Sequence, residues 1–199
     1  MNKIILVGVV VLVILIGIVV ALPFLLGHGG SCSYITPSDA ASVIGGTWSL
    51  QKDISYCYTV SDGVATVKYF NGKTANMSLG SLGGSSFASF SQYTPTGGMT
   101  EFLNGTVNGQ SASIQANYAT FSSQDVAKQF FSTVYMMAQF ASNVQNISSN
   151  EFVVTSGGFG GTYMYTVVKL SGNTVYVVQV TVPVQLSTSQ LADLVNYLG

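Results

Sequence analysis

The sequence predicts an α+β protein: an N-terminal transmembrane helix, then an antiparallel β-sheet with helices packed on one face, and one disulfide bond. Three observations lead to this prediction. The chain begins with a long apolar stretch, two cysteines lie beyond that stretch, and the remainder mixes short β-rich segments with helical patterns. We expect four parts: a cytoplasmic N-terminus at 1–3, an anchor helix at 4–26, a Gly-rich spacer at 27–31 and an extracytoplasmic α+β domain at 32–199.

Residues 4–26 have the length and composition of a membrane-spanning helix. They carry no charge and would extend roughly 34 Å as a helix, enough for a hydrocarbon core of about 30 Å. Lys3 precedes them and the next lysine is Lys52, so the positive-inside rule keeps the N-terminus in the cytoplasm. A cleaved signal peptide is the main alternative, but its apolar region is usually shorter and ends in small residues. A pilin-type helix would need a charged leader ending in a small residue, which residues 1–4 lack.

Cys32 and Cys57 are the only cysteines of the chain. If the domain is exported, a disulfide is their simplest use, and a loop of this length contributes about 3.5 kcal/mol. Lipidation of Cys32 is the alternative; Ser31 suits it, but Gly29 stands where a leucine is expected and Cys57 would lose its partner. A metal site would need more ligands than two cysteines and the single His28, and a redox pair favours C-x-x-C.

The region between the cysteines predicts a short helix. Thr36, Pro37 and Asp39 form an N-terminal capping pattern, and the glycines at 45–46 end the helix. Further along, Gly-containing turns separate segments of β-rich composition. These predicted strands cover residues 54–60, 64–70, 75–79, 98–107, 111–121, 163–170 and 174–184, and residues 80–98 are interpreted as a loop with one possible strand.

Two more helices are predicted in the second half of the chain. The spacing of apolar residues indicates a long helix over 123–144, with Ser122 and Asp125 as a capping box. Ser187 and Gln190 predict the start of a last helix with one apolar face. The order of helix, strands, long helix, two strands and helix is typical of an α+β domain.

The composition excludes some partners. Only 7% of the residues are charged, the net charge is −1 and all 6 basic residues are lysines, so a nucleic-acid-binding surface is not expected. No basic run follows the apolar stretch, so the sequence gives no patch for anionic lipids, and the lipid bilayer is expected to contact only residues 4–26. Acid unfolding comes mostly from protonation of paired carboxylates. With only 7 acidic residues, we expect a domain suited to an acidic exterior, such as that of an acidophilic archaeon.

Few side chains are candidates for chemistry. His28 lies in the spacer, outside the expected fold, so a Ser-His-Asp triad is not expected. Asp53, Glu101 and Glu151 have no evident local role, and two of them could form a general acid and base. The Gly-rich stretch 156–162 lacks the phosphate-loop pattern and leads into a strand. We therefore expect no catalytic residue, metal or cofactor.

Three sequons are possible N-glycosylation sites: Asn76, Asn104 and Asn146. Their number is close to that expected by chance from the composition, so each is only a candidate. The aromatic residues, with the single Trp48 among them, could form either core or a ligand groove.

The stretch ITPSDAASVIG after Cys32, with Cys57 before a strand, resembles small exported lipoproteins of mycobacteria and their relatives. It also resembles the extracellular sensor domains of some bacterial serine/threonine kinases, and the likeness extends in element order over 32–199. The resemblance implies a Cys32–Cys57 bridge and a domain that binds ligands or partners without catalysis. This chain differs because it has a spanning helix where many relatives have a lipidated cysteine, and because it has no kinase domain.

These observations predict a single-pass protein of the cell membrane, whose extracytoplasmic domain binds an unknown ligand or an envelope protein partner and is not an enzyme. The alternative is a structural or accessory subunit of an envelope, pilus-like or membrane-protein assembly. A hydrolase of envelope polymers would need the pair of acids described above.

Overall fold

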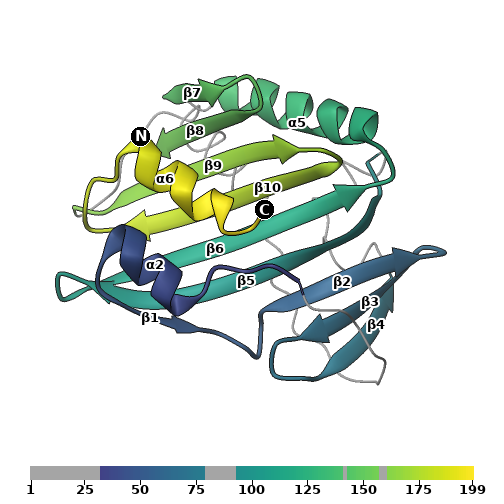
Figure 1. The fold of residues 1–199 in the computed structure, drawn as a ribbon, viewed down its shortest axis with the longest axis horizontal. Helices are drawn as coiled ribbons and strands as arrows, with labels where there is room; N and C mark the ends of the chain where they lie inside the picture. Colours follow the sequence, from purple (N-terminus) through teal and green to yellow (C-terminus); the bar gives the residue numbers. More distant parts are fainter. Residues whose placement is uncertain (1–31, 79–92, 141–142, 157–160) are drawn as a thin grey trace.

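The computed structural model describes residues 32–78, 93–140, 143–156 and 161–199. Their centre is one antiparallel sheet of ten strands (Figure 1). The order across the sheet is β4-β3-β2-β5-β6-β10-β9-β8-β7, and β1 pairs with β5 beside β2. The strands are β1 (Thr47–Leu50), β2 (Tyr56–Ser61), β3 (Val64–Tyr69), β4 (Thr74–Ser78), β5 (Pro95–Val107), β6 (Gln110–Phe121), β7 (Val144–Ser148), β8 (Glu151–Ser156), β9 (Tyr163–Ser171) and β10 (Thr174–Val182).

The helices pack on both faces of the sheet, so the prediction that they share one face is wrong. They are α2 (Pro37–Ile44), α5 (Gln124–Gln139) and α6 (Thr188–Asn196). Successive side chains of a strand point to opposite faces. On β8, Val153 belongs to the core cluster of α2 and α6, whereas Phe152 and Val154 belong to the cluster of α5. Figure 1 shows α2 and α6 side by side in front of the sheet.

The predicted caps of α2 and α6 are confirmed. The backbone N–H of Asp39 donates to Thr36 Oγ1 at 3.2 Å, and the N–H of Thr36 donates to Asp39 Oδ2 at 2.9 Å. Ser187 and Gln190 form the same reciprocal pair at α6. Helix α2 ends at Gly45, whose φ of 85° suits glycine.

Helix α5 differs from its prediction at both ends. Its N-cap is Ser123, whose hydroxyl accepts from the N–H of Val126 at 3.3 Å, so Ser122 is not the cap. The helix ends at Gln139, and β7 begins at Val144, where the prediction still had helix. Val144 packs against the cluster beneath α5, and this tertiary contact favours the strand for a β-branched residue.

Three strands were missing from the prediction: β1, β7 and β8. β1 has only 4 residues; they alternate between polar and apolar, but a run this short gives the weakest signal for a strand. β8 has consecutive apolar residues buried on both faces of the sheet. Its sequence therefore lacks the alternation of polar and apolar residues that indicates a strand. β5 is longer than predicted and begins at Pro95; the residues before it at 79–92 lie outside the described chain.

Two of the predicted hairpin turns have the expected backbone. Asp62 and Gly63 have φ values of 52° and 75°, and Asn108 and Gly109 have 51° and 75°. Positive φ at both central residues is the signature of a type I′ turn, which matches the right-handed twist of the flanking strands. The β2–β3 and β5–β6 hairpins follow from these local signals.

Candidate functional site

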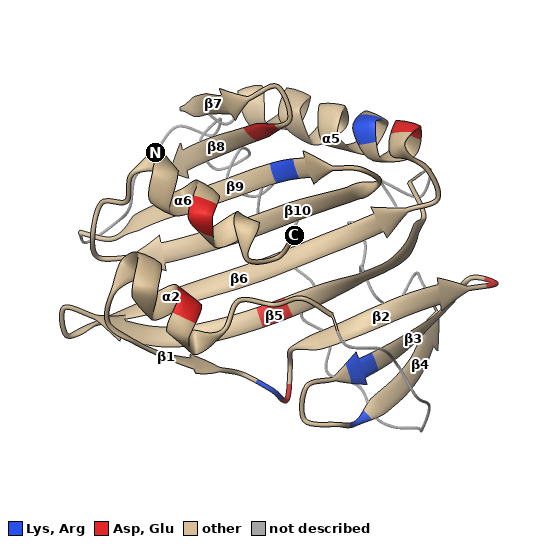
Figure 2. Ribbon diagram, viewed as in Figure 1, with Lys and Arg blue, Asp and Glu red and all other residues tan. Residues whose placement is uncertain are grey.

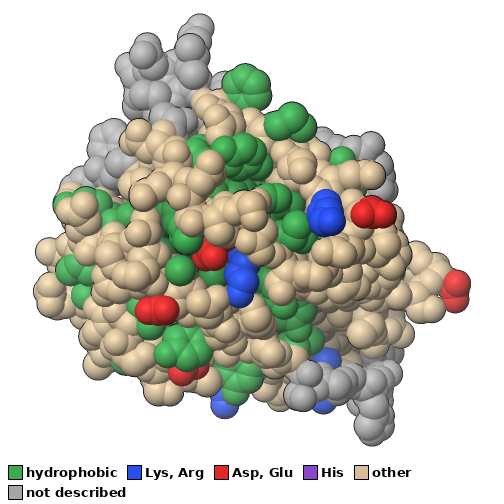
Figure 3. Space-filling model, turned by 45° about the horizontal axis from the view of Figure 1, so that its top comes forward, with side chains coloured by type: hydrophobic (Ala, Val, Ile, Leu, Met, Phe, Trp, Pro, Cys, Tyr) green, Lys and Arg blue, Asp and Glu red, His purple; other side chains and the backbone are tan. Residues whose placement is uncertain are grey.

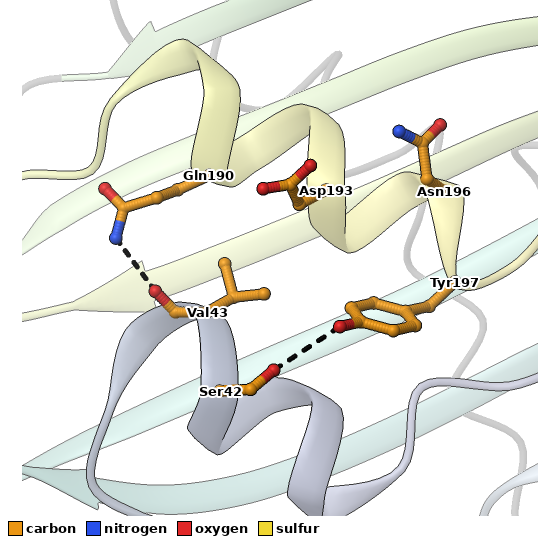
Figure 4. A pocket seen from close by; sticks show the side chains of 6 residues that line it. All are labelled: Ser42, Val43, Gln190, Asp193, Asn196 and Tyr197. Atoms are coloured by element: carbon orange, nitrogen blue, oxygen red, sulfur yellow. Dashed lines mark hydrogen bonds between the residues drawn. The ribbon is translucent and has the colours of Figure 1, made fainter.

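The candidate site is an open groove between α2 and α6 (Figure 4). Its volume is about 500 Å³, and its lining consists of Ser42, Val43, Gln190, Asp193, Asn196 and Tyr197. Two contacts join the helices across it. Gln190 Nε2 donates to the backbone carbonyl of Val43 at 2.8 Å, and the hydroxyls of Ser42 and Tyr197 lie 3.4 Å apart.

The groove has the chemistry of a binding site for a polar molecule. Asp193 is its only charged lining residue, and Figure 4 shows it between Gln190 and Asn196 along α6. The hydroxyl of Ser42 donates to the backbone carbonyl of Asp39 at 2.7 Å, so its proton is engaged within its own helix. The lining therefore offers hydrogen-bond donors, acceptors and one negative charge, but no activated nucleophile.

Lys169 holds one wall of the groove in place. Its Nζ on β9 donates to Asn196 Oδ1 at 2.8 Å and to the backbone carbonyl of Gly199 at 2.8 Å. It also lies 6.0 Å from the ring centre of Tyr176 on β10. These contacts attach the end of α6, and with it one wall of the groove, to the sheet.

Glu101 lies buried on β5, on the side of the sheet that α2 covers. Its Oε2 accepts a hydrogen bond from the backbone N–H of Ile35 at 3.0 Å, while Oε1 is buried without a hydrogen-bond partner. Burial raises the pKa of Glu101 to about 8; the Ile35 N–H opposes this shift, and the nearby Asp39 carboxylate adds to it. Glu101 is therefore mostly neutral at pH 7.

The structure keeps two of the three unexplained acids, Glu101 and Glu151, far apart. Glu101 and Glu151 lie on β5 and β8, with β6, β10 and β9 between them, which corresponds to roughly 19 Å at 4.8 Å per strand. Glu151 is half-buried opposite Lys169, and its burial raises its pKa. Asp53 accepts from Asn71 Nδ2 at 2.7 Å in an exposed turn. Glu101 and Glu151 therefore do not form an acid and base separated by at most about 10 Å, as glycoside hydrolysis needs.

Cys32 and Cys57 form a disulfide, with their Cα atoms 6.3 Å apart. The bond ties the segment before α2 to β2, as expected from the sequence. Trp48 is a structural residue: its Nε1 donates to the carbonyl of Gly45 at 2.8 Å. Its ring packs so closely on Gly105 that a Cβ there would lie 2.6 Å from a ring atom.

Some sequence candidates are located without being tested. The sequon residues Asn76, Asn104 and Asn146 are exposed on β4, β5 and β7, and their glycosylation stays a prediction. His28 and residues 157–160 of the Gly-rich stretch lie outside the described residues.

Sequence reasoning missed the groove. It gave no ligand-binding role to Ser42, Asp193 or Tyr197. Gln190 and Val43 are 147 positions apart, so only tertiary packing joins the two sides. The capping boxes predicted both helices but carry no information about which helices lie together.

The described residues thus form a disulfide-linked α+β domain with an open polar groove. A similar structure is the extracellular domain of PknH from Mycobacterium tuberculosis. The TM-score is 0.55 at 15% sequence identity, and the match covers 82% of this chain and 91% of that chain. At the level of fold, this confirms the expected resemblance to the extracellular domains of bacterial serine/threonine kinases.

Comparisons at the level of sequence gave no relative. No family model matches the chain. No curated protein matches it either. Among the described residues, none of the helices has the length and apolar character needed to cross a bilayer. Residues 4–26, which carry the predicted anchor, are outside that part of the chain.

Proposed function

We propose that this chain is a membrane-anchored extracytoplasmic domain that binds a ligand or a protein partner at the cell surface and does not catalyse a reaction. The groove between α2 and α6 is the observation that carries the proposal, because it is open and rich in hydrogen-bonding groups. The fold shared with an extracellular domain supports an exported location. The apolar residues 4–26 supply the anchor in this proposal.

The lining limits the kind of molecule that binds. Asp193 favours a ligand group that is positively charged or donates hydrogen bonds, and Asn196 and Tyr197 add neutral partners. The described surface carries few charges: on the face shown in Figure 3 a few red and blue side chains lie among many uncharged ones. Recognition by hydrogen bonds and shape is therefore favoured over recognition by a strong electric field.

Co-purification of the full-length protein from its own membranes tests this proposal. The wild type, Asp193→Asn and Asp125→Asn are compared after solubilisation in detergent, and bound small molecules and proteins are identified by mass spectrometry. Asp125 is a matched control because it is an exposed acid on α5, on the other face of the sheet. We expect the wild type and D125N to retain a molecule that D193N loses. Retention of the same material by all three proteins would contradict binding in the groove.

A second candidate function is that of an accessory subunit in a membrane-protein assembly. Met136 and Phe140 stand one helical turn apart at the end of α5, with exposed fractions of 57% and 81%. Two exposed apolar side chains on one helix face favour contact with another protein. Crosslinking in native membranes separates the possibilities: a ladder of self-adducts indicates self-assembly, and one foreign adduct indicates an accessory role.

A further inference from the structure

Three lysines gather at one corner of the sheet, beside the disulfide. Lys52 lies in the turn between β1 and β2, Lys68 lies near the end of β3, and Lys73 lies in the turn between β3 and β4. Figure 2 shows these positive positions together at one end of the molecule. The two turns are joined by a hydrogen bond of 3.2 Å from the Asn71 N–H to the Lys52 carbonyl. We call these three lysines, with the side chains of Tyr34 and Ile54, the basic corner.

The basic corner is unusual for this protein because its charge is positive. It holds three of the five lysines of the described chain, and Asp53 is the acid among them. The other described residues include only two lysines, Lys128 and Lys169, but six acids. The charge of the domain is therefore divided, with its positive part at the corner and its negative part elsewhere.

Apolar and aromatic side chains accompany these lysines. Ile54 is 51% exposed and Tyr34 is 39% exposed. The ring of Tyr34 lies 5.0 Å from the ring of Phe70. A hollow of about 270 Å³ opens here, lined by Cys32, Tyr34, Leu50, Lys52, Cys57, Lys68, Tyr69, Phe70 and Gly72. Lysines beside exposed aromatic and aliphatic groups are the composition that favours a membrane interface.

The chain itself places this corner next to the bilayer. Cys32 is bonded to Cys57, so the chain enters the domain at the basic corner. Between Cys32 and the predicted anchor there are only the spacer residues 27–31, which span at most about 18 Å when fully extended. Cys32 is therefore restrained to lie within that distance of the end of the predicted anchor, and its partner Cys57 pairs with Lys68 of the corner.

We propose that the basic corner docks on the anionic phospholipid head groups of the bilayer that holds the predicted anchor. This inference rests on the membrane anchor of the proposed function. Lys52, Lys68 and Lys73 face the phosphates, Ile54 and Tyr34 enter the head-group layer, and the groove between α2 and α6 is left open to a ligand. Attraction to an anionic surface is worth roughly a fivefold gain in binding for each lysine close to it.

The sequence did not reveal this surface. No basic run follows the apolar stretch, so a patch for anionic lipids was not expected from the order of residues. The patch forms because β3 folds back beside β2, which brings Lys68 and Lys73 next to Lys52. The proposal differs from that expectation, and the experiment below decides between them.

The full-length protein in protein-free vesicles provides the test. One vesicle preparation contains phosphatidylcholine alone, and the other contains phosphatidylcholine and phosphatidylglycerol in equal parts. Flotation measures anchoring, and hydrogen exchange of the backbone amides at 51–55 and 70–73 measures docking. Lys52→Gln and Lys128→Gln are compared, because both remove one charge and Lys128 lies on α5. Trp48 fluorescence on heating verifies that each variant is folded.

Docking predicts that the wild type floats with both vesicles and that its turn amides exchange several-fold more slowly with phosphatidylglycerol present. In K52Q the protection of these amides should be roughly fivefold weaker than in the wild type, and in K128Q it should be unchanged. Flotation with equal exchange in both vesicles overturns the docking and leaves the anchor in place. Equal loss in both variants also overturns it, because the effect would then follow total charge. Failure to float overturns the anchor and the docking together.

Discussion

Glu101 on β5 accepts a hydrogen bond from the backbone N–H of Ile35 at 3.0 Å, although the two residues are 66 positions apart. Neither residue is exposed to solvent. The bond fastens the segment before α2 to the middle of the sheet, and it does so with a group whose pKa is raised to about 8. The free energy of unfolding is therefore linked to pH through the burial of Glu101, which raises its pKa although the Ile35 N–H opposes the shift.

The sign of the linkage follows from the direction of the shift. Between pH 4.5 and about 8 the folded chain keeps a proton on Glu101 that the unfolded chain releases. The stabilisation from the raised pKa is complete below the lower value and is lost as the pH rises through the higher value. We expect the wild type to be less stable at pH 8 than at pH 5 by a few kcal/mol.

Glu101→Gln should remove most of this dependence, because glutamine imitates the protonated acid and never ionises. Its carbonyl oxygen can still accept from the Ile35 N–H. Urea unfolding of residues 32–199 at the two pH values measures the effect, with Asp62→Asn in the exposed β2–β3 turn as the control. E101Q should be more stable than the wild type at the higher pH. An unchanged pH dependence in E101Q would show that another group is responsible.

Acid should unfold the domain only weakly. The chain has 7 acidic residues, and Glu101 gains a proton without losing stability. The melting temperature of residues 32–199 should therefore fall by less than about 15 °C between neutral pH and pH 3. Differential scanning calorimetry provides the measurement, and a larger fall would mean that the remaining carboxylates carry more stability than their number indicates.

Ser123→Ala should destabilise the domain by about 1 kcal/mol, because the Ser123 hydroxyl satisfies the N–H of Val126 at the start of α5. Ser122→Ala is the matched control, since Ser122 precedes the cap and is exposed. Its expected change is within about 0.5 kcal/mol. Chemical denaturation of both variants decides the position of the cap, and equal effects would contradict the assignment to Ser123.

Loss of the Cys32–Cys57 bridge should cost about 3.5 kcal/mol, because the bond closes a loop of 25 residues in the unfolded chain. The variant with both cysteines replaced by serine is compared with the oxidised wild type in urea. Reduction of the wild type should move its unfolding midpoint toward that of the variant. A midpoint that does not respond to the reductant would indicate that the bond constrains little of the unfolded state.

The sequence predicted well those elements whose signal, a capping box or a turn, lies within a few neighbouring residues. The capping boxes at Thr36 and Ser187 locate helix starts, and the turn at Asn108 locates a hairpin, because each signal and its structure share one local backbone. The cap of α5 shows the limit of this approach. Ser122 and Ser123 are the same residue type, so the sequence does not distinguish them, and in the structure Ser123 is the N-cap.

The candidate site could not be predicted because its contacts are remote in sequence. Ser42 and Tyr197 meet only after α2 and α6 pack on one cluster, and the strand order decides that Glu101 and Glu151 stay apart. The side of the sheet that α5 covers follows from the path of the chain through β6 and β7. None of these relationships has a short-range signature.

The bridge between Cys32 and Cys57 also determines how a pulling force would travel through the domain. If the domain is tethered through residues 27–31 as proposed, tension in that spacer reaches Cys32 and passes partly through the two sulfurs into β2. β2 is hydrogen-bonded by β3 on one side and β5 on the other, so the load enters a region that resists extension. The main chain between Cys32 and α2 carries only part of this tension, because the two sulfurs offer a second path into the sheet.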